Sequence, residues 1–370
     1  MTDRDPLYVT RATLPPIGEL LPLLEQIWQS RILSNFGSIH RQLEAALSRH
    51  LGIEHLTLVA NATLGLILSL LHLGAKSEII TTPFSFVASA HAIHWARARP
   101  VFADIDPITL NLDPSSVERQ ITPETRCILA VHCFGNPCDV AELKAVAERH
   151  GLLLVYDAAH AFGVKESGRS VLHHGDLSVL SFHATKVFNT AEGGAIVSRD
   201  RETKLALDRL CNFGIADETS IPEIGLNAKL SELHAALGLA MLPHVDAAIA
   251  ARSIVARRYW DQLMGVEGIR CLCSPDQPGR NHYAFPIIVE ERYPLTRDAL
   301  YVRLQQQNIY ARRYFHPLIS DLPMYRNVPT AQPRELPIAR DAAARILCLP
   351  MYPDLASVDQ QKIIDIIRAP

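Results

Sequence analysis

Short apolar runs that alternate with helix-length segments are the feature that most limits the folds open to this chain. The apolar runs, rich in Val, Ile and Leu, occupy residues 55–60, 78–82, 100–105, 127–134, 152–158, 177–183 and 194–198. Segments with a one-sided apolar pattern, typical of amphipathic helices, occupy residues 38–51, 63–73, 86–98, 114–120 and 140–150. Strands that are buried on both faces and separated by helices form a largely parallel sheet. We therefore predict an α/β fold in which a mostly parallel sheet of about seven strands is sandwiched by helices.

The pattern changes beyond Arg199. Residues 229–263 form a long, mostly helical stretch, in which Pro243 predicts a break or a kink. The remainder contains a strand pattern at 282–289 and helix patterns at 296–307 and 358–368, which suffice for a smaller α+β domain. We predict a large domain over residues 1–250 and a small C-terminal domain over residues 251–370.

The charge balance limits the classes of partner. The 370 residues include 36 Lys and Arg against 39 Asp and Glu, a formal net charge of -3. Such a chain offers no basic stripe for a nucleic-acid backbone and no polybasic run for a membrane surface. The apolar run at 64–75 is shorter than the roughly 20 residues of a membrane-spanning helix, and the N-terminus lacks a signal-peptide pattern. We expect no nucleic-acid or membrane partner and a cytoplasmic location.

The cysteines predict neither a disulfide framework nor a metal site. Their number, seven, is odd, and they lack dense, even spacing, so we expect reduced thiols. Cys133 and Cys138 have no second Cys/His pair at zinc-ligand spacing, and His132 points to the opposite face of the same strand. We predict no bound metal.

Two motifs that follow strands could bind the ends of a planar anionic ligand. In Asn61-Ala62-Thr63 a strand runs directly into a helix, so the free N–H groups of the helix start and the Thr63 hydroxyl could hold an anion. The alternative is a simple helix cap without a ligand. Phe86 starts the helix after the next strand, where its ring could stack on a planar ligand, although a lone Phe at a helix start is more often part of the core.

Two further motifs bring a carboxylate and an amine to strand ends. The apolar run at 152–158 leads to Asp157, with His160 three residues later, and a buried carboxylate there requires a cationic or hydrogen-bonding partner. The alternative is a capping Asp beside a core His. Lys186 follows the run at 177–183, in a site where a lysine can lose its proton and become a nucleophile. A lysine after a strand is otherwise a solvated surface residue.

Together these motifs match the requirements of pyridoxal 5'-phosphate (PLP). Its phosphate suits a helix N-terminus, its ring stacks on an aromatic side chain, its pyridinium nitrogen pairs with an Asp and its aldehyde condenses with a lysine. The combination indicates a PLP site at the carboxyl edge of the sheet, in which Lys186 and Asp157 are the catalytic candidates.

At this level of detail the sequence resembles the DegT/DnrJ/EryC1/StrS family of sugar aminotransferases, which are fold type I PLP-dependent transferases. The resemblance covers nearly the whole chain. It rests on Asn61-Ala62-Thr63, Glu192-Gly193-Gly194 and residues 83–88, 101–106, 157–160, 181–186 and 225–232.

The resemblance implies the cofactor contacts. Lys186 would carry PLP covalently and Asp157 would hold the pyridinium proton, while Phe86 would stack on the ring. The phosphate would be bound by Ala62 and Thr63 together with the Ser181 hydroxyl.

Three further implications concern the cofactor and the subunits. Asn227 would reach the phosphate of the neighbouring subunit's cofactor, which implies a homodimer with shared active sites. His160 stands where many members have a glutamine that contacts the phenolic oxygen of PLP, and Ala62 stands where glycine is common. Both departures are compatible with cofactor binding, and the charge state of His160 would then tune the cofactor.

The segments 132–138 and 157–163 resemble the branch of the family that forms dTDP-4-amino-4,6-dideoxyglucose. The implied reaction transfers an amino group from L-glutamate, through pyridoxamine 5'-phosphate, to a keto carbon, C4, of a dTDP-linked 4-keto-6-deoxy sugar. Such sugars serve surface-polysaccharide (O-antigen) or natural-product synthesis. Substrate contacts are expected from His183, Tyr314 and His316, although the last two also fit a surface loop.

Three alternatives remain open at this stage. The first is amination of a 3-keto sugar by an enzyme of the same family. The second is a PLP-dependent sugar dehydratase, in which the lysine is replaced by histidine. The third is a non-catalytic sugar-binding or regulatory protein, which would have lost Lys186 or Asp157.

Overall fold

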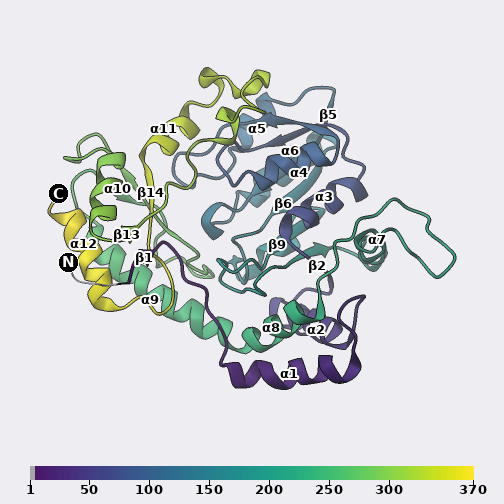
Figure 1. Cartoon of the computed structure of the whole chain (residues 1–370). Helices are drawn as coiled ribbons and strands as arrows, with labels where there is room; N and C mark the ends of the chain where they lie inside the picture. Colours follow the sequence, from purple (N-terminus) through teal and green to yellow (C-terminus); the bar gives the residue numbers. More distant parts are fainter. Residues whose placement is uncertain (1–4) are drawn as a thin grey trace.

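A seven-stranded sheet forms the centre of the molecule, as the computed structural model of residues 5–370 shows (Figure 1). The strand order is β2-β10-β9-β6-β5-β3-β4. All neighbouring strands are parallel except β10, which runs antiparallel to both β2 and β9. The strands are β2 (His55–Val59), β3 (Ser77–Thr81), β4 (Ala98–Phe102), β5 (Thr125–Val131), β6 (Leu153–Asp157), β9 (Leu177–Ser181) and β10 (Gly194–Ser198). The predicted α/β fold with a mostly parallel sheet is confirmed.

Helices cover both faces of the sheet. Successive strand residues point to opposite sides, so apolar side chains on both faces need helices to bury them. Val179 of β9 packs with α3 (Ala62–His72), α4 (Ala88–Trp95) and α7 (Arg201–Cys211), whereas Leu180 packs on the other face. That other face is covered by α2 (Ser38–Leu51), α5 (Pro114–Arg119), α6 (Val140–His150) and α8 (Glu232–Met241). Strands buried on both sides explain the nearly unbroken apolar runs of the sequence.

The C-terminal part has its own core. It contains a three-stranded antiparallel sheet of β11 (Ile269–Cys271), β12 (Phe285–Val289) and β14 (Ile346–Leu349). Helices α9 (Val245–Leu263), α10 (Arg297–Gln306) and α12 (Ser357–Arg368) pack with this sheet. Short β1 (Leu7–Tyr8) pairs with β13 (Ile309–Tyr310), so an N-terminal segment also joins this part.

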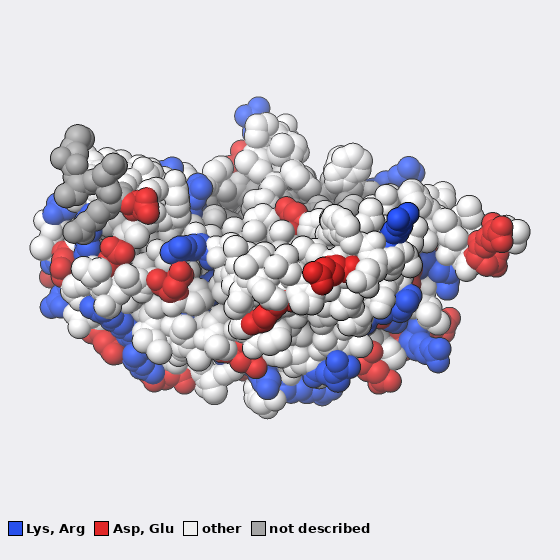
Figure 2. Space-filling model, turned by 60° about the horizontal axis from the view of Figure 1, so that its bottom comes forward, with Lys and Arg blue, Asp and Glu red and all other residues white. Residues whose placement is uncertain are grey.

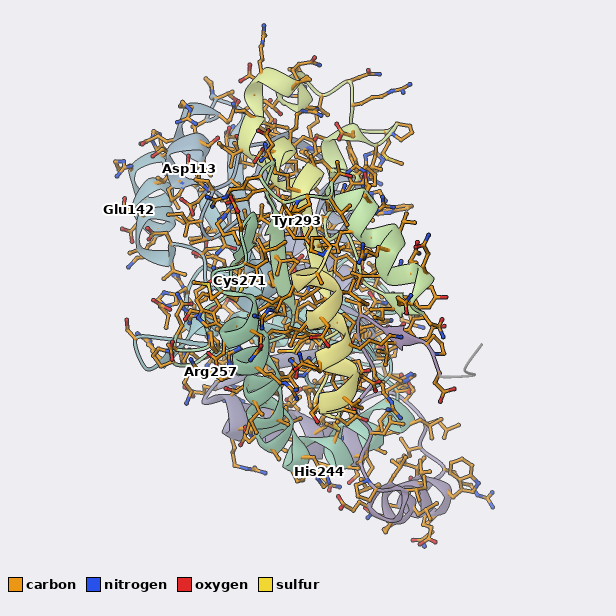
Figure 3. All side chains as sticks on the ribbon, turned by 90° about the vertical axis from the view of Figure 1, so that its left-hand side faces the viewer. Asp113, Glu142, His244, Arg257, Cys271 and Tyr293 are labelled. Carbon is orange, nitrogen blue, oxygen red and sulfur yellow. The ribbon has the colours of Figure 1, made fainter. Side chains whose placement is uncertain are left out.

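Helix α9 connects the two parts (Figure 1). It begins after His244 and leads to β11, which carries Cys271 (Figure 3). Residue 250, our predicted boundary, lies inside this helix. A separate apolar cluster, in which Phe84, Phe134 and Phe315 meet, packs the carboxyl edge of the large sheet against the C-terminal part. This contact positions C-terminal side chains at the ends of the parallel strands.

One described stretch, Glu232–Leu263, is long and apolar enough to cross a membrane by length and composition alone. The predicted break is present, because Pro243 lies in the 3-10 turn Leu242–His244 between α8 and α9. Buried side chains from both helices, such as Ala235 and Tyr259, pack into the protein cores. A helix in the core of a globular domain meets the same criterion.

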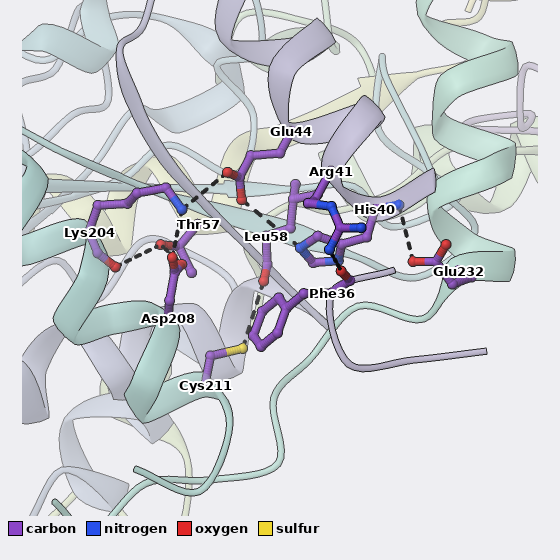
Figure 4. A network of polar contacts seen from close by, with 10 residues as sticks. All are labelled: Phe36, His40, Arg41, Glu44, Thr57, Leu58, Lys204, Asp208, Cys211 and Glu232. Atoms are coloured by element: carbon purple, nitrogen blue, oxygen red, sulfur yellow. Dashed lines mark hydrogen bonds and ion pairs between the residues drawn. The ribbon is translucent and has the colours of Figure 1, made fainter. Parts of the chain in front are cut away.

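A polar network ties α2 to α7, α8 and strand β2 (Figure 4). Glu232, which is buried at the start of α8, accepts the N–H groups of Ile39 and His40 and so caps the first turn of α2. Lys204 of α7 bridges the carboxylates of Glu44 and Asp208. A buried carboxylate at a helix N-terminus and a bridged lysine are stabilising arrangements. We therefore interpret this network as structural and not as part of a functional site.

The charges on the surface agree with the composition. On the face drawn in Figure 2, Lys and Arg side chains are interspersed with Asp and Glu side chains around a broad uncharged area. A face of this kind has no field of one sign that would attract a polyanion.

Candidate active site

A cavity of about 310 Å³ lies at the carboxyl ends of the parallel strands. Most of the predicted site residues line it: Ala62, Thr63, Phe86, Asp157, His160, Ser181, His183, Lys186 and Tyr314. A larger hollow of about 710 Å³ lies around residues 169–176, where β9 begins, and contains none of the predicted residues. The smaller cavity is therefore the candidate site.

The start of α3 forms one wall of the cavity. The Asn61 side chain accepts the N–H of Leu64 at 2.9 Å, so the predicted capping interaction is present. The N–H groups of Ala62 and Thr63 belong to the first helical turn, where no intrahelical acceptor exists. Ser181, at the end of β9, lines the same cavity. These groups form a candidate anion cradle beside the positive end of the helix, and the Asn61 cap is compatible with anion binding there.

Phe86 presents its ring to the cavity rather than to the core. Its residue surface is 62% exposed, which excludes the alternative that it is a buried core side chain. An exposed aromatic face beside an anion cradle suits a planar ring with a phosphate group.

Asp157 is the last residue of β6 and is only 5% exposed. The Ser89 hydroxyl donates to its Oδ2 at 2.8 Å, and the N–H of Ala159 donates to its Oδ1 at 3.1 Å. Burial nevertheless raises the pKa of this carboxyl, and the two hydrogen bonds and the charge of Lys186 offset the effect only in part. A cationic group bound in the cavity would supply the compensation that Asp157 lacks.

Lys186 lies in a loop between β9 and β10 whose two sides are joined by backbone hydrogen bonds. The N–H of Phe182 donates to Gly193 O at 2.9 Å, and that of Ala184 donates to Ala191 O at 2.7 Å. Burial lowers the pKa of Lys186 to about 8, while the Asp157 carboxylate acts in the opposite direction. At neutral pH a much larger fraction of this amine is unprotonated than of a solvated lysine, as a nucleophile requires.

His160 is buried, and its Nδ1 has no hydrogen-bond partner among residues 5–370. Its ring stacks on Tyr283, with centroids 4.2 Å apart and planes 12° apart. Burial and the nearby Lys186 ammonium lower the pKa of His160 well below its ordinary value. Such a shift favours the neutral imidazole, which can offer one N–H to a ligand.

The other predicted residues are distributed differently. His183 is exposed at the cavity, where its Nδ1 lies 2.8 Å from Thr185 Oγ1 and its Nε2 lies 3.8 Å from Glu192 Oε1. Tyr314 also lines the cavity. His316 and Asn227 are exposed outside it.

Sequence reasoning missed Ser89, Glu192 and Tyr283. Ser89 lies one helical turn after Ser85, and the two hydroxyls are 3.2 Å apart, so a serine pair at helical spacing was an available signal. Tyr283 comes from the C-terminal part and reaches the cavity only through the packing of that part. No local pattern in the sequence marks it.

The residues at this site fit PLP. The anion cradle, the exposed aromatic face, the carboxylate without a contacting cation and the lysine with a lowered pKa are the four features that this cofactor needs. Among residues 5–370 there is no group of three or more His, Cys, Asp or Glu arranged for a metal ion.

A mostly parallel sheet with a lysine and a carboxylate at its carboxyl edge defines the class of fold type I aminotransferases, whose cofactor is PLP. The sequence profile of the DegT/DnrJ/EryC1/StrS aminotransferase family matches residues 17–368. The chain belongs to this family, and it is an aminotransferase.

Individual relatives support the same assignment. The chain is 48% identical to a dTDP-4-amino-4,6-dideoxy-D-glucose transaminase of Shigella dysenteriae over 98% of both chains. It is 43% identical to an Escherichia coli protein of the same name over 94% of both. The crystal structure of DesI in the presence of its TDP-sugar product superposes with a TM-score of 0.93 at 35% identity, covering 99% of this chain and 93% of that one.

Proposed function

We propose that this aminotransferase moves the amino group of L-glutamate to the C4 keto carbon of a dTDP-linked 4-keto-6-deoxy sugar. The observation that carries the proposal is the 48% identity, over nearly the whole chain, to a transaminase named for the corresponding 4-amino sugar. The superposition on DesI, which was crystallised with a TDP-sugar product, supports a nucleotide-linked substrate. Such a product belongs to surface-polysaccharide or natural-product sugar synthesis in the cytoplasm.

Each residue at the site has a distinct task in this reaction. Bound PLP supplies an aldehyde and an electron-accepting ring. Asp157 would pair with the ring nitrogen, and Ser89 and Ala159 fix its carboxylate in place. Lys186 would hold the cofactor and would move a proton at the substrate carbon. Ala62, Thr63 and Ser181 would hold the phosphate, and Phe86 and His160 would hold the ring.

We also propose that the protein is a homodimer in which Asn227 reaches the phosphate of the partner's cofactor. A loop at 212–227 projects from the body of the molecule after α7 (Figure 1). It exposes the apolar side chains of Phe213, Ile221 and Ile224, the last of which is 95% exposed. Burial of exposed apolar side chains against another surface is favourable, so this loop is suited to pack against a second copy of the chain.

The position of the new amine tests the proposed substrate. The purified enzyme, loaded with PLP, is incubated with L-glutamate and separately with 3-keto and 4-keto dTDP sugars. We expect amination of the 4-keto sugar, with the new amine assigned to C4 by NMR. Amination at C3, or turnover of the 3-keto sugar alone, would contradict the proposed substrate and leave the aminotransferase assignment intact.

Mixed dimers test whether Asn227 acts across the interface. Lys186→Ala and Asn227→Asp are each expected to abolish most activity, the second because its carboxylate would repel the phosphate. After dissociation and random reassociation of an equimolar mixture, one site of each hybrid dimer combines Lys186 with the partner's Asn227. About a quarter of the wild-type activity should return. If Asn227 serves the site of its own subunit, mixing restores nothing.

A further inference from the structure

Tyr283 brings the C-terminal part of the chain into direct contact with the reactive lysine. Its phenol oxygen lies 3.4 Å from Lys186 Nζ, and the same amine lies 4.9 Å from the centroid of the ring. The same ring stacks on His160, with centroids 4.2 Å apart. Tyr283 therefore contacts two of the residues that line the cavity, although it comes from the C-terminal part of the chain.

Buried hydrogen bonds fix the position of Tyr283. Asn281 accepts the N–H of Tyr283 at 3.1 Å and donates to His160 O at 2.8 Å and to Phe162 O at 3.0 Å. The side chain of Asn281 thus joins the segment of Tyr283 to the segment that follows β6. Arg252, from α9, donates to Tyr283 O at 3.4 Å.

The contact also depends on a close approach at Gly135. A Cβ atom at this position would lie 2.7 Å from both Asn281 Oδ1 and His160 O, and the backbone φ of +78° favours glycine. The segment 281–283 therefore lies in a fixed place against the large sheet.

We propose that Tyr283 is the hydrogen-bonding partner that orients the free ε-amine of Lys186 and adjusts its protonation. When the amine carries a proton, its N–H donates to the phenol oxygen. When the amine is neutral, the phenol O–H donates to the nitrogen lone pair. This inference rests on the proposed role of Lys186 as the lysine that carries the cofactor.

The surroundings keep Tyr283 in its protonated form. Burial raises the pKa of the phenol above its ordinary value, and the Arg252 charge offsets this effect only in part. Tyr283 therefore acts through a hydrogen bond and not as a phenolate base. The other groups that face this pair are the Asp157 carboxyl, the His160 imidazole, the Thr185 hydroxyl, the Cys133 and Cys348 thiols, and His183 and Glu192 at the cavity wall.

The test measures the Lys186 amine in the PLP-free protein. An amine-reactive acylating reagent is applied across a pH series, and modification at Lys186 is followed by mass spectrometry. In Tyr283→Phe the ring remains, but the ammonium loses a hydrogen-bond acceptor, and charge-assisted bonds are stronger than neutral ones. The pH midpoint should therefore fall by about half a unit, so that labelling at pH 7 is roughly two- to threefold faster than in wild type.

Two further variants complete the experiment. Tyr301→Phe removes a phenol oxygen that is bonded to Gln305, and it should leave the midpoint unchanged. Asn281→Ala removes both N–H donors of the Asn281 contact without adding a charge, and it should shift the midpoint in the same direction as Tyr283→Phe. An unchanged midpoint in both Tyr283→Phe and Asn281→Ala would overturn the inference.

A kinetic measurement separates orientation from substrate binding. In the PLP-loaded enzyme, Tyr283→Phe should lower kcat about tenfold while the KM for the sugar changes less than about twofold, because the contact is to the lysine. A rise in KM without a loss of kcat would contradict the assigned role. If borohydride instead fixed PLP on another lysine, the proposed role of Lys186 would be wrong. The labelling of the PLP-free protein would still show whether Tyr283 shifts the pKa of Lys186.

Discussion

Lys186→Ala is expected to give a folded protein that retains no covalently fixed PLP after borohydride reduction and has lost turnover by about a thousandfold or more. The substitution removes the nucleophile and the group that moves the proton at the substrate carbon. Lys186 is half-buried and has a lowered pKa, so its loss removes no ion pair on which the fold depends. Cofactor attachment is measured by mass spectrometry after reduction, and turnover is measured by glutamate-dependent amination of the sugar.

Lys362→Ala is the matched control for this experiment. Lys362 lies on α12 and bonds only the backbone of Gln307, far from the cavity residues. We expect full PLP attachment and full turnover. A Lys186→Ala protein that still fixes PLP and still turns over would refute the central assignment of the site.

Asp157→Asn is expected to lower kcat by about a hundredfold to a thousandfold, because a neutral amide cannot hold the proton on the ring nitrogen. In the PLP-free protein, however, the same substitution should not lower the stability. Burial raises the pKa of Asp157 above its unfolded value, so the stability that this group provides is present at low pH and is lost as the pH rises through the folded pKa. At pH 8 the amide removes that loss, and the melting temperature should stay the same or rise.

Asp104→Asn provides a contrasting control. Asp104 is also a buried carboxylate just beyond a strand end, but it accepts the N–H groups of Ile105, Ile338 and Ala339 and so caps α11 (Pro337–Arg345). An amide has only one acceptor oxygen, so this variant should melt at a lower temperature and keep its kcat. If Asp157→Asn instead destabilised the PLP-free protein and spared kcat, its role would be structural.

The sequence predicted the sheet because every strand in it is buried on both faces. Such strands produce apolar runs that need no context to recognise, and all seven lie within a few residues of their predicted places. Boundaries were less certain where the backbone turns. The helix predicted over 86–98 ends at Trp95, since Arg97 adopts a positive φ of 63° and begins the approach to β4.

Among the helices that were not predicted, two were obscured for a different reason. In α1 (Ile17–Ser30), Pro22 lies inside the helix and large apolar side chains such as Trp28 are exposed, which obscures the apolar face formed by Leu20, Leu23, Leu24 and Ile27. In α7 the charged residues obscure an apolar face formed by Ala206, Leu207 and Leu210. The cap by Asp200, which accepts the N–H of Thr203, was a usable signal.

The site residues also fall into those that the sequence could predict and those that depend on tertiary packing. Residues that directly follow a strand, such as Asp157, Ser181 and Thr63, were predictable because the carboxyl ends of parallel strands meet at one edge. Tyr283 was not, because its place depends on how the C-terminal part packs against that edge. Contacts of that kind arise from tertiary packing and leave no periodic pattern in the chain.

The hydrogen-bonded loop between β9 and β10 has a consequence for how the sugar preference of the enzyme can change. Its backbone bonds from Phe182 to Gly193 and from Ala184 to Ala191 join the two sides of the loop that carries Lys186. The C-terminal segment that carries Tyr314 lines the cavity from outside that loop. Remodelling of that segment would change the sugar preference without changing the loop that carries Lys186.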